Sequence, residues 1–194
     1  MNLYNQIKFI LGITRSHNIV RRYFIVNGFD GALTMLGLIM GFLFSTSVDL
    51  SIILTACLSA AIALGMSGMS SAYVSESAER KRALAKLQDA MIRDLHDSAH
   101  GDAARYVPLL IAIVNGFAPF IISLIILSPL ILSINGFNLP FSPLHIAILN
   151  ALILVFLLGV FLGRISGVSW FRSGVQTLIV ATITALLIYL FTQN

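Results

Sequence analysis

The chain has 194 residues, of which 58% are hydrophobic and only 10% are charged, and its mean hydropathy is +0.94. A soluble domain of this length needs far more polar residues to cover its surface, so the composition indicates an integral membrane protein. The net charge of +4 does not indicate a nucleic-acid partner, because the basic residues flank apolar segments and membrane topology explains them. The one cysteine, Cys57, excludes a disulfide framework.

Residues 1–22 precede the first long apolar segment and mix apolar side chains with basic ones such as Lys8 and Arg15. This mixture predicts an amphipathic helix that lies on the inner leaflet and acts as a plain anchor. The stretch has no continuous apolar core and no small-residue cleavage site, so we do not expect a removable signal peptide.

Five apolar segments are long enough to cross a bilayer, which takes about 20 residues per helix. Their apolar runs are continuous rather than alternating, which favours helices over the strands of a barrel. The predicted fold is therefore all-α, with spans at residues 23–44, 50–74, 106–134, 143–163 and 171–191. The third span contains Pro108, Pro119 and Pro129, so we expect a kink, a tilt or a break in it.

The 12 lysines and arginines predict the orientation of the chain. They lie before the first span, between spans two and three, and between spans four and five, so an N-inside arrangement puts all of them on one side. By the positive-inside rule, the N-terminus is then cytoplasmic and the C-terminus outside. The predicted organisation is an interfacial helix (1–22), spans one and two (23–74), a short cytoplasmic helical segment (75–105) and spans three to five (106–194).

Asp30 is the only acidic residue within a predicted span. A carboxylate in hydrocarbon costs roughly 2.5–3.5 kcal/mol on the insertion scale, so it normally faces a partner, water or an ion. Counting ~1.5 Å per residue puts it at about the depth of Met66, Met69 and Asn115 in the next two spans, with Thr34 one turn further along. Carboxylate and thioether ligands together suit a borderline ion such as Fe²⁺ better than Mg²⁺ or Ca²⁺.

Simpler interpretations of these residues stay open. Asp30 could instead N-cap a helix that begins at Gly31. Methionines in membrane helices often only fill gaps in the packing, so Met66 and Met69 are candidate ligands only because they share the depth of Asp30.

Gly37 and Gly41 form a GxxxG pattern in the first span. Small residues let helix backbones approach closely, which fits either internal packing or the seam of a homodimer. A dimer through the first span would bring two copies of Asp30 near one axis.

Residues 28–34 (Gly-Phe-Asp-Gly-Ala-Leu-Thr), followed by Gly37 and Gly41, resemble the first-helix signature of the vacuolar iron transporter family. Residues 67–80, with Tyr-Val-Ser at 73–75, resemble the end of that family's second helix. The five spans, the orientation and the charged stretch between spans two and three are similar as well.

The resemblance implies a homodimeric exporter of Fe²⁺, and often of Mn²⁺, that is driven by proton exchange and needs no cofactor. It implies that Asp30 is the family's first-helix aspartate. Aligned on Tyr73, the family's second-helix methionine falls at Gly68, one residue before Met69, and Ala72 stands where the family usually has glutamate. Without a visible organellar targeting signal, the expected location is a prokaryotic plasma membrane.

Residues 75–100 are predicted to be helical, and two charged pairs at i,i+4 spacing, Glu76 with Arg80 and Asp89 with Arg93, would support an exposed helix. In the family this segment gathers metal with several glutamates. His96 and His100 have the helical spacing at which two imidazoles can share one ion. A solvated helix end is the alternative interpretation. The candidate cytoplasmic ligands are Glu76, Glu79, Asp94, His96, Asp97 and His100.

Two other classes of function are weaker. An intramembrane enzyme needs an HExxH motif, paired aspartates or a serine with a histidine, whereas the spans hold one acid and no histidine except His145 at an edge. A structural or regulatory membrane protein would not require Asp30. We therefore expect a transporter, not an enzyme.

Overall fold

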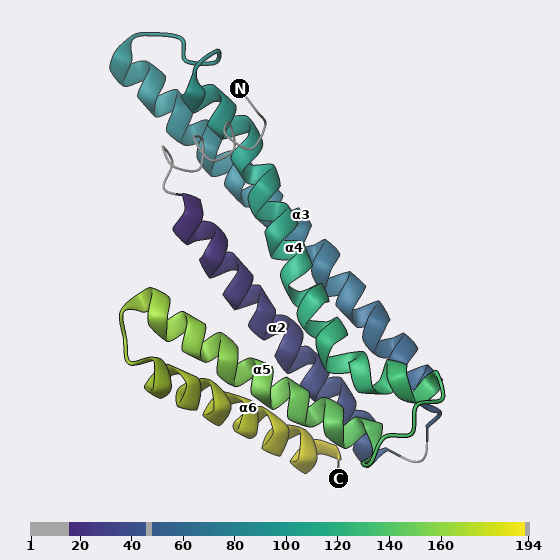
Figure 1. Cartoon of the computed structure of the whole chain (residues 1–194). Coiled ribbons are helices and arrows are strands. Elements are labelled where there is room, and N and C mark those ends of the chain that lie inside the picture. The colour runs from purple at the N-terminus through teal and green to yellow at the C-terminus, as the bar shows by residue number, and fades with distance from the viewer. Residues whose placement is uncertain (1–15, 46–47, 193–194) are drawn as a thin grey trace. The chain divides into compact units, whose positions relative to one another are not determined.

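The computed structural model describes residues 16–45 and 48–192, with side chains from residue 19 onward. In these ranges the chain forms five α-helices and no strand (Figure 1). The helices are α2 (Ser16–Phe44), α3 (Leu50–Met91), α4 (Ala99–Ile134), α5 (Pro143–Ser166) and α6 (Trp170–Thr192). Each is long and apolar enough to cross a membrane, which confirms the predicted all-α fold with five spans. Most of the predicted interfacial helix lies outside the described residues.

Two helices extend well beyond the predicted spans. α3 has 42 residues, and its length of ~63 Å is about twice the thickness of the hydrocarbon core. It passes residue 74 without a break, and α4 likewise begins at Ala99, ahead of the predicted third span. The segment predicted at residues 75–105 is therefore made by the projecting ends of α3 and α4.

The prediction of one helix over residues 75–100 is wrong. α3 gives way to a turn at residues 92–98, where Ile92 has a φ of 50°. Ser98 then caps α4, because its hydroxyl accepts hydrogen bonds from two backbone N–H groups of the first helical turn, at 3.2 and 3.4 Å. A Cβ at Gly101 would collide with the carbonyl of the preceding turn, so glycine permits this tight connection.

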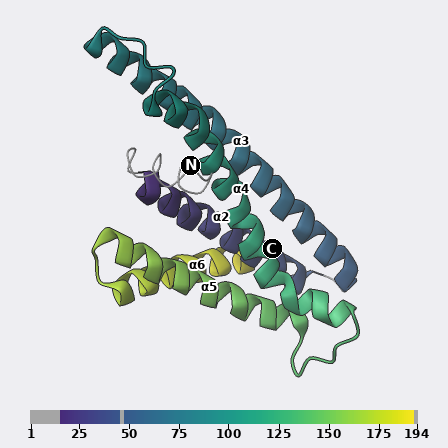
Figure 2. The ribbon, with the colours of Figure 1, turned by 45° about the horizontal axis from the view of Figure 1, so that its top comes forward.

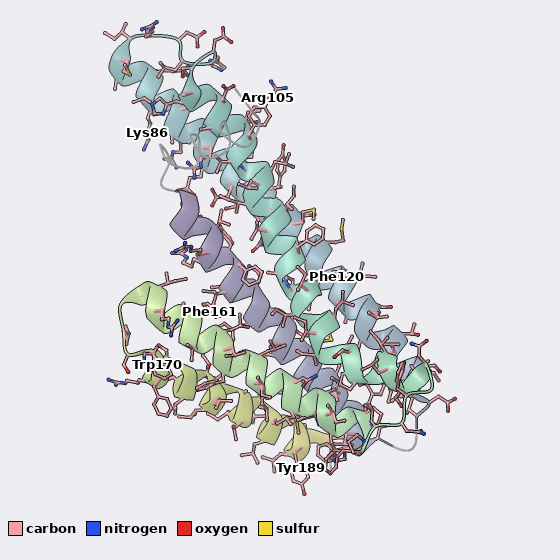
Figure 3. All side chains as sticks on the ribbon, viewed as in Figure 1. Lys86, Arg105, Phe120, Phe161, Trp170 and Tyr189 are labelled. Atoms are coloured by element: carbon pink, nitrogen blue, oxygen red, sulfur yellow. The ribbon has the colours of Figure 1, made fainter. Side chains whose placement is uncertain are left out.

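The packed side chains form two clusters that belong to two compact units. Unit 1 comprises Met1–Phe24 and Met66–Phe117, and unit 2 comprises Ile25–Gly65 and Ala118–Asn194. In unit 1, α3 and α4 lie side by side and antiparallel (Figures 1 and 2), with Lys86 and Arg105 on the two arms of this hairpin (Figure 3). Ala72, Ala103 and Val107 are buried between the arms.

Unit 2 buries a larger apolar core, in which Met35, Ile39, Ile126 and Val155 are inaccessible. Within it, α5 and α6 lie side by side in both ribbon views (Figures 1 and 2). The turn between them depends on Gly167, which has a φ of 70° and ends α5.

Small residues set the close contact of α5 with α6. A Cβ at Gly163 would lie 2.8 Å from the side chain of Ser173, and one at Gly159 would collide with Thr177. The Thr177 hydroxyl instead donates to the carbonyl of Val155 at 3.1 Å. Such contacts hold helices together in lipid, where no hydrophobic force drives them together.

Aromatic side chains mark both ends of α6. Figure 3 shows Trp170 near the end that follows the turn from α5 and Tyr189 near the other end. About 28 Å of helix separates them, close to the thickness of the hydrocarbon core. Trp and Tyr favour the two membrane–water interfaces, so α6 has the length and the anchors of a spanning helix.

Three prolines do not break α4, which is one helix from Ala99 to Ile134. Pro129 lacks the N–H that would bond the carbonyl of Ile125. The hydroxyl of Ser128 donates to that carbonyl instead, at 2.8 Å. The hydroxyl thus replaces the missing N–H and satisfies a carbonyl to which lipid offers no hydrogen bond. Of the kink, the tilt and the break that were expected for this span, the break is absent.

Candidate functional site

Asp30 lies well inside α2, which begins at Ser16. It therefore does not cap a helix that starts at Gly31, and the capping interpretation is wrong. Its side chain is exposed and has no hydrogen bond or ion pair with any residue that the structure describes. An apolar membrane helix thus carries a carboxylate that these residues do not neutralise.

The packing of α2 explains why Asp30 points outward. Gly31 is buried, and a Cβ on it would lie only 2.7 Å from the Cα of Pro119. Gly28 is buried against the side chain of Leu158. At about 100° per residue, Asp30 falls on the side of α2 opposite this close contact with α4 and α5.

Asp30 shares its face of α2 with Thr34, Gly37 and Gly41. Thr34 is half-buried. A Cβ at Gly37 would meet one methyl group of Ile188 at 3.4 Å, and a Cβ at Gly41 would meet nothing within 4 Å. The face therefore combines an exposed carboxylate with small residues that are partly buried.

The other predicted intramembrane ligands lie in unit 1. Met69 is half-buried against the cluster around Ala72, whereas Met66 is 57% exposed. The two thioethers are therefore in different surroundings. Because Asp30 and Thr34 belong to unit 2, convergence of all five residues on one ion stays a prediction.

Asn115 is 3% exposed, and its amide nitrogen donates to the backbone carbonyl of Gly68 at 2.6 Å. This bond connects α4 to α3. The sequence suggested Asn115 as a ligand but could not indicate this partner. Every residue of a helix has a backbone carbonyl, so no sequence pattern distinguishes the carbonyl of Gly68 from the others.

Glu76 is 6% exposed although it carries a charge. It accepts a hydrogen bond from the hydroxyl of Tyr23 on α2, at 3.1 Å, and pairs with Nε of Arg80 at 3.7 Å, which confirms the predicted i,i+4 pair. The second predicted pair is absent from the described ion pairs, because Arg93 lies beyond the end of α3 while Asp89 lies within it. Tyr23 was missed, since only the tertiary structure brings it to Glu76.

The two histidines do not have the helical spacing that their sequence suggested. His100 is in α4, but His96 is in the turn before it, with its Nδ1 2.7 Å from Oδ1 of Asp94. The backbone N–H and the ring of His96 hold the pKa of Asp94 below its usual value. Glu79, Asp97 and His100 are exposed. Across residues 16–45 and 48–192, no three His, Cys, Asp or Glu side chains form a group that could hold a metal ion.

A model of the VIT family matches residues 81–193, which is more than half of the chain. The chain belongs to the VIT family. This confirms the resemblance to vacuolar iron transporters, and it makes the protein a membrane transporter of metal ions, not an enzyme, at the level of the family. The matched segment begins within α3, so the first-helix signature at residues 28–34 lies outside it.

An uncharacterized protein of Methanocaldococcus jannaschii is 28% identical to this VIT protein over 172 residues, which cover 87% of this chain and 86% of the relative. The two proteins are thus similar over most of their lengths. No solved structure matches the chain.

Proposed function

We propose that this VIT-family protein exports a divalent metal ion, Fe²⁺ and also Mn²⁺, from the cytoplasm in exchange for protons. The observation that carries the proposal is the exposed carboxylate of Asp30 within an apolar helix, without a partner among the described residues. A charge at such a place is costly. A metal ion or a proton that binds there in turn would offset the cost, and the same carboxylate would serve both sides of the exchange.

The proposed ligands combine oxygen with sulfur. Asp30 and Thr34 on α2 would supply oxygens, and Met69 and Met66 on α3 would supply thioether sulfur. The amide nitrogen of Asn115 donates a hydrogen bond to the carbonyl of Gly68, so Oδ1 is the atom that Asn115 would offer to a cation. Such a set favours Fe²⁺ over Mg²⁺ and Ca²⁺, which prefer oxygen alone.

The proposed assembly is a homodimer through the first span. On the face of Asp30, Gly37 and Gly41 the carboxylate is exposed and the glycines are partly buried, with room for a Cβ at Gly41, and the glycines would let a second α2 approach closely. Two Asp30 carboxylates near one axis would neutralise a divalent ion. The proposed location is a prokaryotic plasma membrane with the N-terminus inside, where the α3–α4 hairpin would collect ions with Glu76, Glu79, Asp94, His96, Asp97 and His100.

The test is metal uptake into proteoliposomes, measured for Fe²⁺, Mn²⁺, Co²⁺ and Zn²⁺ with and without a pH gradient. Asp30→Asn keeps the shape of the side chain and removes its charge, so flux should collapse while expression and dimerisation stay normal. Asp49→Asn is the matched control, because Asp49 is an exposed acid ahead of α3 that has no proposed role.

Ion selectivity gives a second measurement. Met69→Leu should reduce flux less than Asp30→Asn does, and more for Fe²⁺ than for Mn²⁺, because sulfur favours the softer ion. Full flux in a well-folded Asp30→Asn protein would refute the pathway. Absence of flux for every ion in the wild type would favour the structural or regulatory alternative.

A further inference from the structure

Arg164 and Arg172 lie on the two sides of the connection between α5 and α6. Arg164 is in the last turn of α5, and Arg172 is in the first turn of α6. Both side chains are exposed, and neither has a hydrogen bond, an ion pair or a ring contact with any residue that the structure describes. The sequence has no aspartate or glutamate after Asp102. Two guanidinium groups at one end of this helix pair therefore have no anion among the described residues.

The close contact of α5 with α6 brings the two positions to one level. A Cβ at Gly163 would lie 2.8 Å from the side chain of Ser173 and 3.0 Å from the Cα of Trp170. Arg164 directly follows this glycine, and Arg172 directly precedes this serine. The two arginines are thus attached to adjacent backbones. Because their side chains are long and exposed, both guanidinium groups can reach one ligand at the end of the helix pair.

Aromatic side chains place this end of α5 and α6 at the membrane surface. Trp170 and Phe171 are 51% and 57% exposed, and their rings make an edge contact with centroids 5.9 Å apart. Phe171 makes a second edge contact with Phe156 of α5, at 6.5 Å. Tryptophan favours the membrane–water interface, where lipid headgroups begin. The two arginines flank Trp170 in sequence, so they lie at the level of the headgroups.

An exposed apolar stripe of α5 leads from the interior of the membrane to Arg164. It consists of Ile153, Leu157 and Phe161, which follow one another at four-residue spacing and are all exposed. Arg164 comes three residues after Phe161, so it continues nearly the same face. A phospholipid has the same division into an apolar chain and a charged phosphate. The stripe therefore matches an acyl chain, and the guanidinium matches the phosphate at its end.

We propose that the end of the α5–α6 pair binds the phosphate of an anionic phospholipid between Arg164 and Arg172, with Trp170 beside the glycerol backbone of the lipid. A guanidinium binds phosphate through two parallel hydrogen bonds, which gives geometric specificity as well as charge attraction. Basic residues between membrane helices on the cytoplasmic side bind acidic headgroups in this way. The predicted orientation of the chain assigns the lipid to the inner leaflet. The site is separate from the pathway proposed for the metal ion.

The competing explanation is that the two arginines only orient the chain, as the positive-inside rule requires. Substitution by lysine separates the two explanations. Lysine keeps the positive charge, and with it the orientation, but it binds phosphate as a point charge without the guanidinium fork. The double variant Arg164→Lys/Arg172→Lys should therefore insert normally and lose most of its preference for the anionic lipid.

Trp170 is the only tryptophan of the chain, so its fluorescence reports on this site alone. The full-length protein is reconstituted into phosphatidylcholine vesicles with a small fraction of brominated phosphatidylglycerol, whose bromine atoms quench a tryptophan that they contact. The reference is the same fraction of brominated phosphatidylcholine. We expect the wild type to prefer phosphatidylglycerol about fivefold or more. Arg82→Lys is the matched control, because Arg82 is exposed and lies on the extension of α3 beyond the predicted span.

Equal quenching of the wild type by the two brominated lipids overturns the proposal. An unchanged preference in the lysine double variant overturns it as well, and leaves the arginines only their orienting role. If the double variant does not insert, Arg164→Lys and Arg172→Lys are measured singly, and each should lose part of the preference.

Inorganic phosphate, added as a competitor, separates a lipid from free phosphate. It should not relieve the quenching, because a bound lipid is also held by its acyl chains. Relief of quenching would show a site for free phosphate and would overturn the assignment to a lipid. No arm of this experiment measures metal flux, so normal flux in Asp30→Asn would refute the proposed pathway and leave the lipid site standing.

Discussion

The amide of Asn115 donates a 2.6 Å hydrogen bond to the backbone carbonyl of Gly68 and so joins α4 to α3 inside unit 1. Both helices are candidate membrane spans. A buried amide in lipid has no water to bind, and a carbonyl of a neighbouring helix takes its place. Asn115 thus supports the helix pair through its nitrogen, independently of any ion at its oxygen.

Asn115→Ala should lower the free energy of unfolding by about 0.5–1.5 kcal/mol, as measured for hydrogen bonds between membrane helices. Unfolding in mixed micelles with increasing SDS measures this change. Thr184→Ala is the control, because the Thr184 hydroxyl is exposed and bonds only to its own helix, at Val180. Equal stability of the wild type and the Asn115→Ala variant would show that the bond contributes nothing.

Gly31→Ala should be destabilising by about 1–3 kcal/mol, the usual cost of overpacking. The added Cβ would lie 2.7 and 2.8 Å from backbone atoms of Pro119, which cannot move aside as a flexible side chain can. Gly41→Ala is the matched control, since its Cβ would meet nothing within 4 Å. The same SDS titration compares them, and a neutral Gly31→Ala would contradict the close contact of α2 with α4.

Gly41→Leu should weaken the proposed homodimer without unfolding the single chain. A Cβ at Gly41 meets no atom of its own chain within 4 Å, so a leucine there should disturb an approaching second copy more than its own chain. Gly37→Leu is a less clean test, because its side chain would also press on Ile188. Crosslinking and size-exclusion with light scattering in mild detergent measure the dimer. A strictly monomeric wild-type protein would contradict the assembly.

Single cysteines test the orientation of the spans. In a Cys57→Ala background, Asp49→Cys and Phe137→Cys should react with an impermeant thiol reagent added outside, whereas Lys86→Cys should react only after the membrane is opened. Asp49 and Phe137 are both exposed in the structure, and they lie between α2 and α3 and between α4 and α5, respectively. Equal labelling at all three sites in intact cells would refute the five-span orientation.

The sequence by itself determined the five apolar helices of the described residues and, nearly to the residue, the positions at which α2 ends, α3 begins, α4 ends, α5 begins and α6 ends. Long apolar runs specify membrane helices strongly, because lipid leaves the backbone no alternative to internal hydrogen bonds. The end of α3 at Met91 and the start of α4 at Ala99 were misjudged, since basic residues mark the membrane surface but do not end a helix. The turn at Ile92 was missed for a similar reason, because the polar residues around it are compatible with a helix as well as with a turn.

Only the tertiary structure decided what the polar residues of the spans do. It placed Asp30 inside α2 and on its outer face, because Gly28 and Gly31 occupy the face that packs against α4 and α5. It also joined Asn115 to Gly68 and Glu76 to Tyr23, across sequence separations of 47 and 53 residues. Periodicity within a helix indicates which residues share a face, but the partner of that face is fixed by how the helices pack.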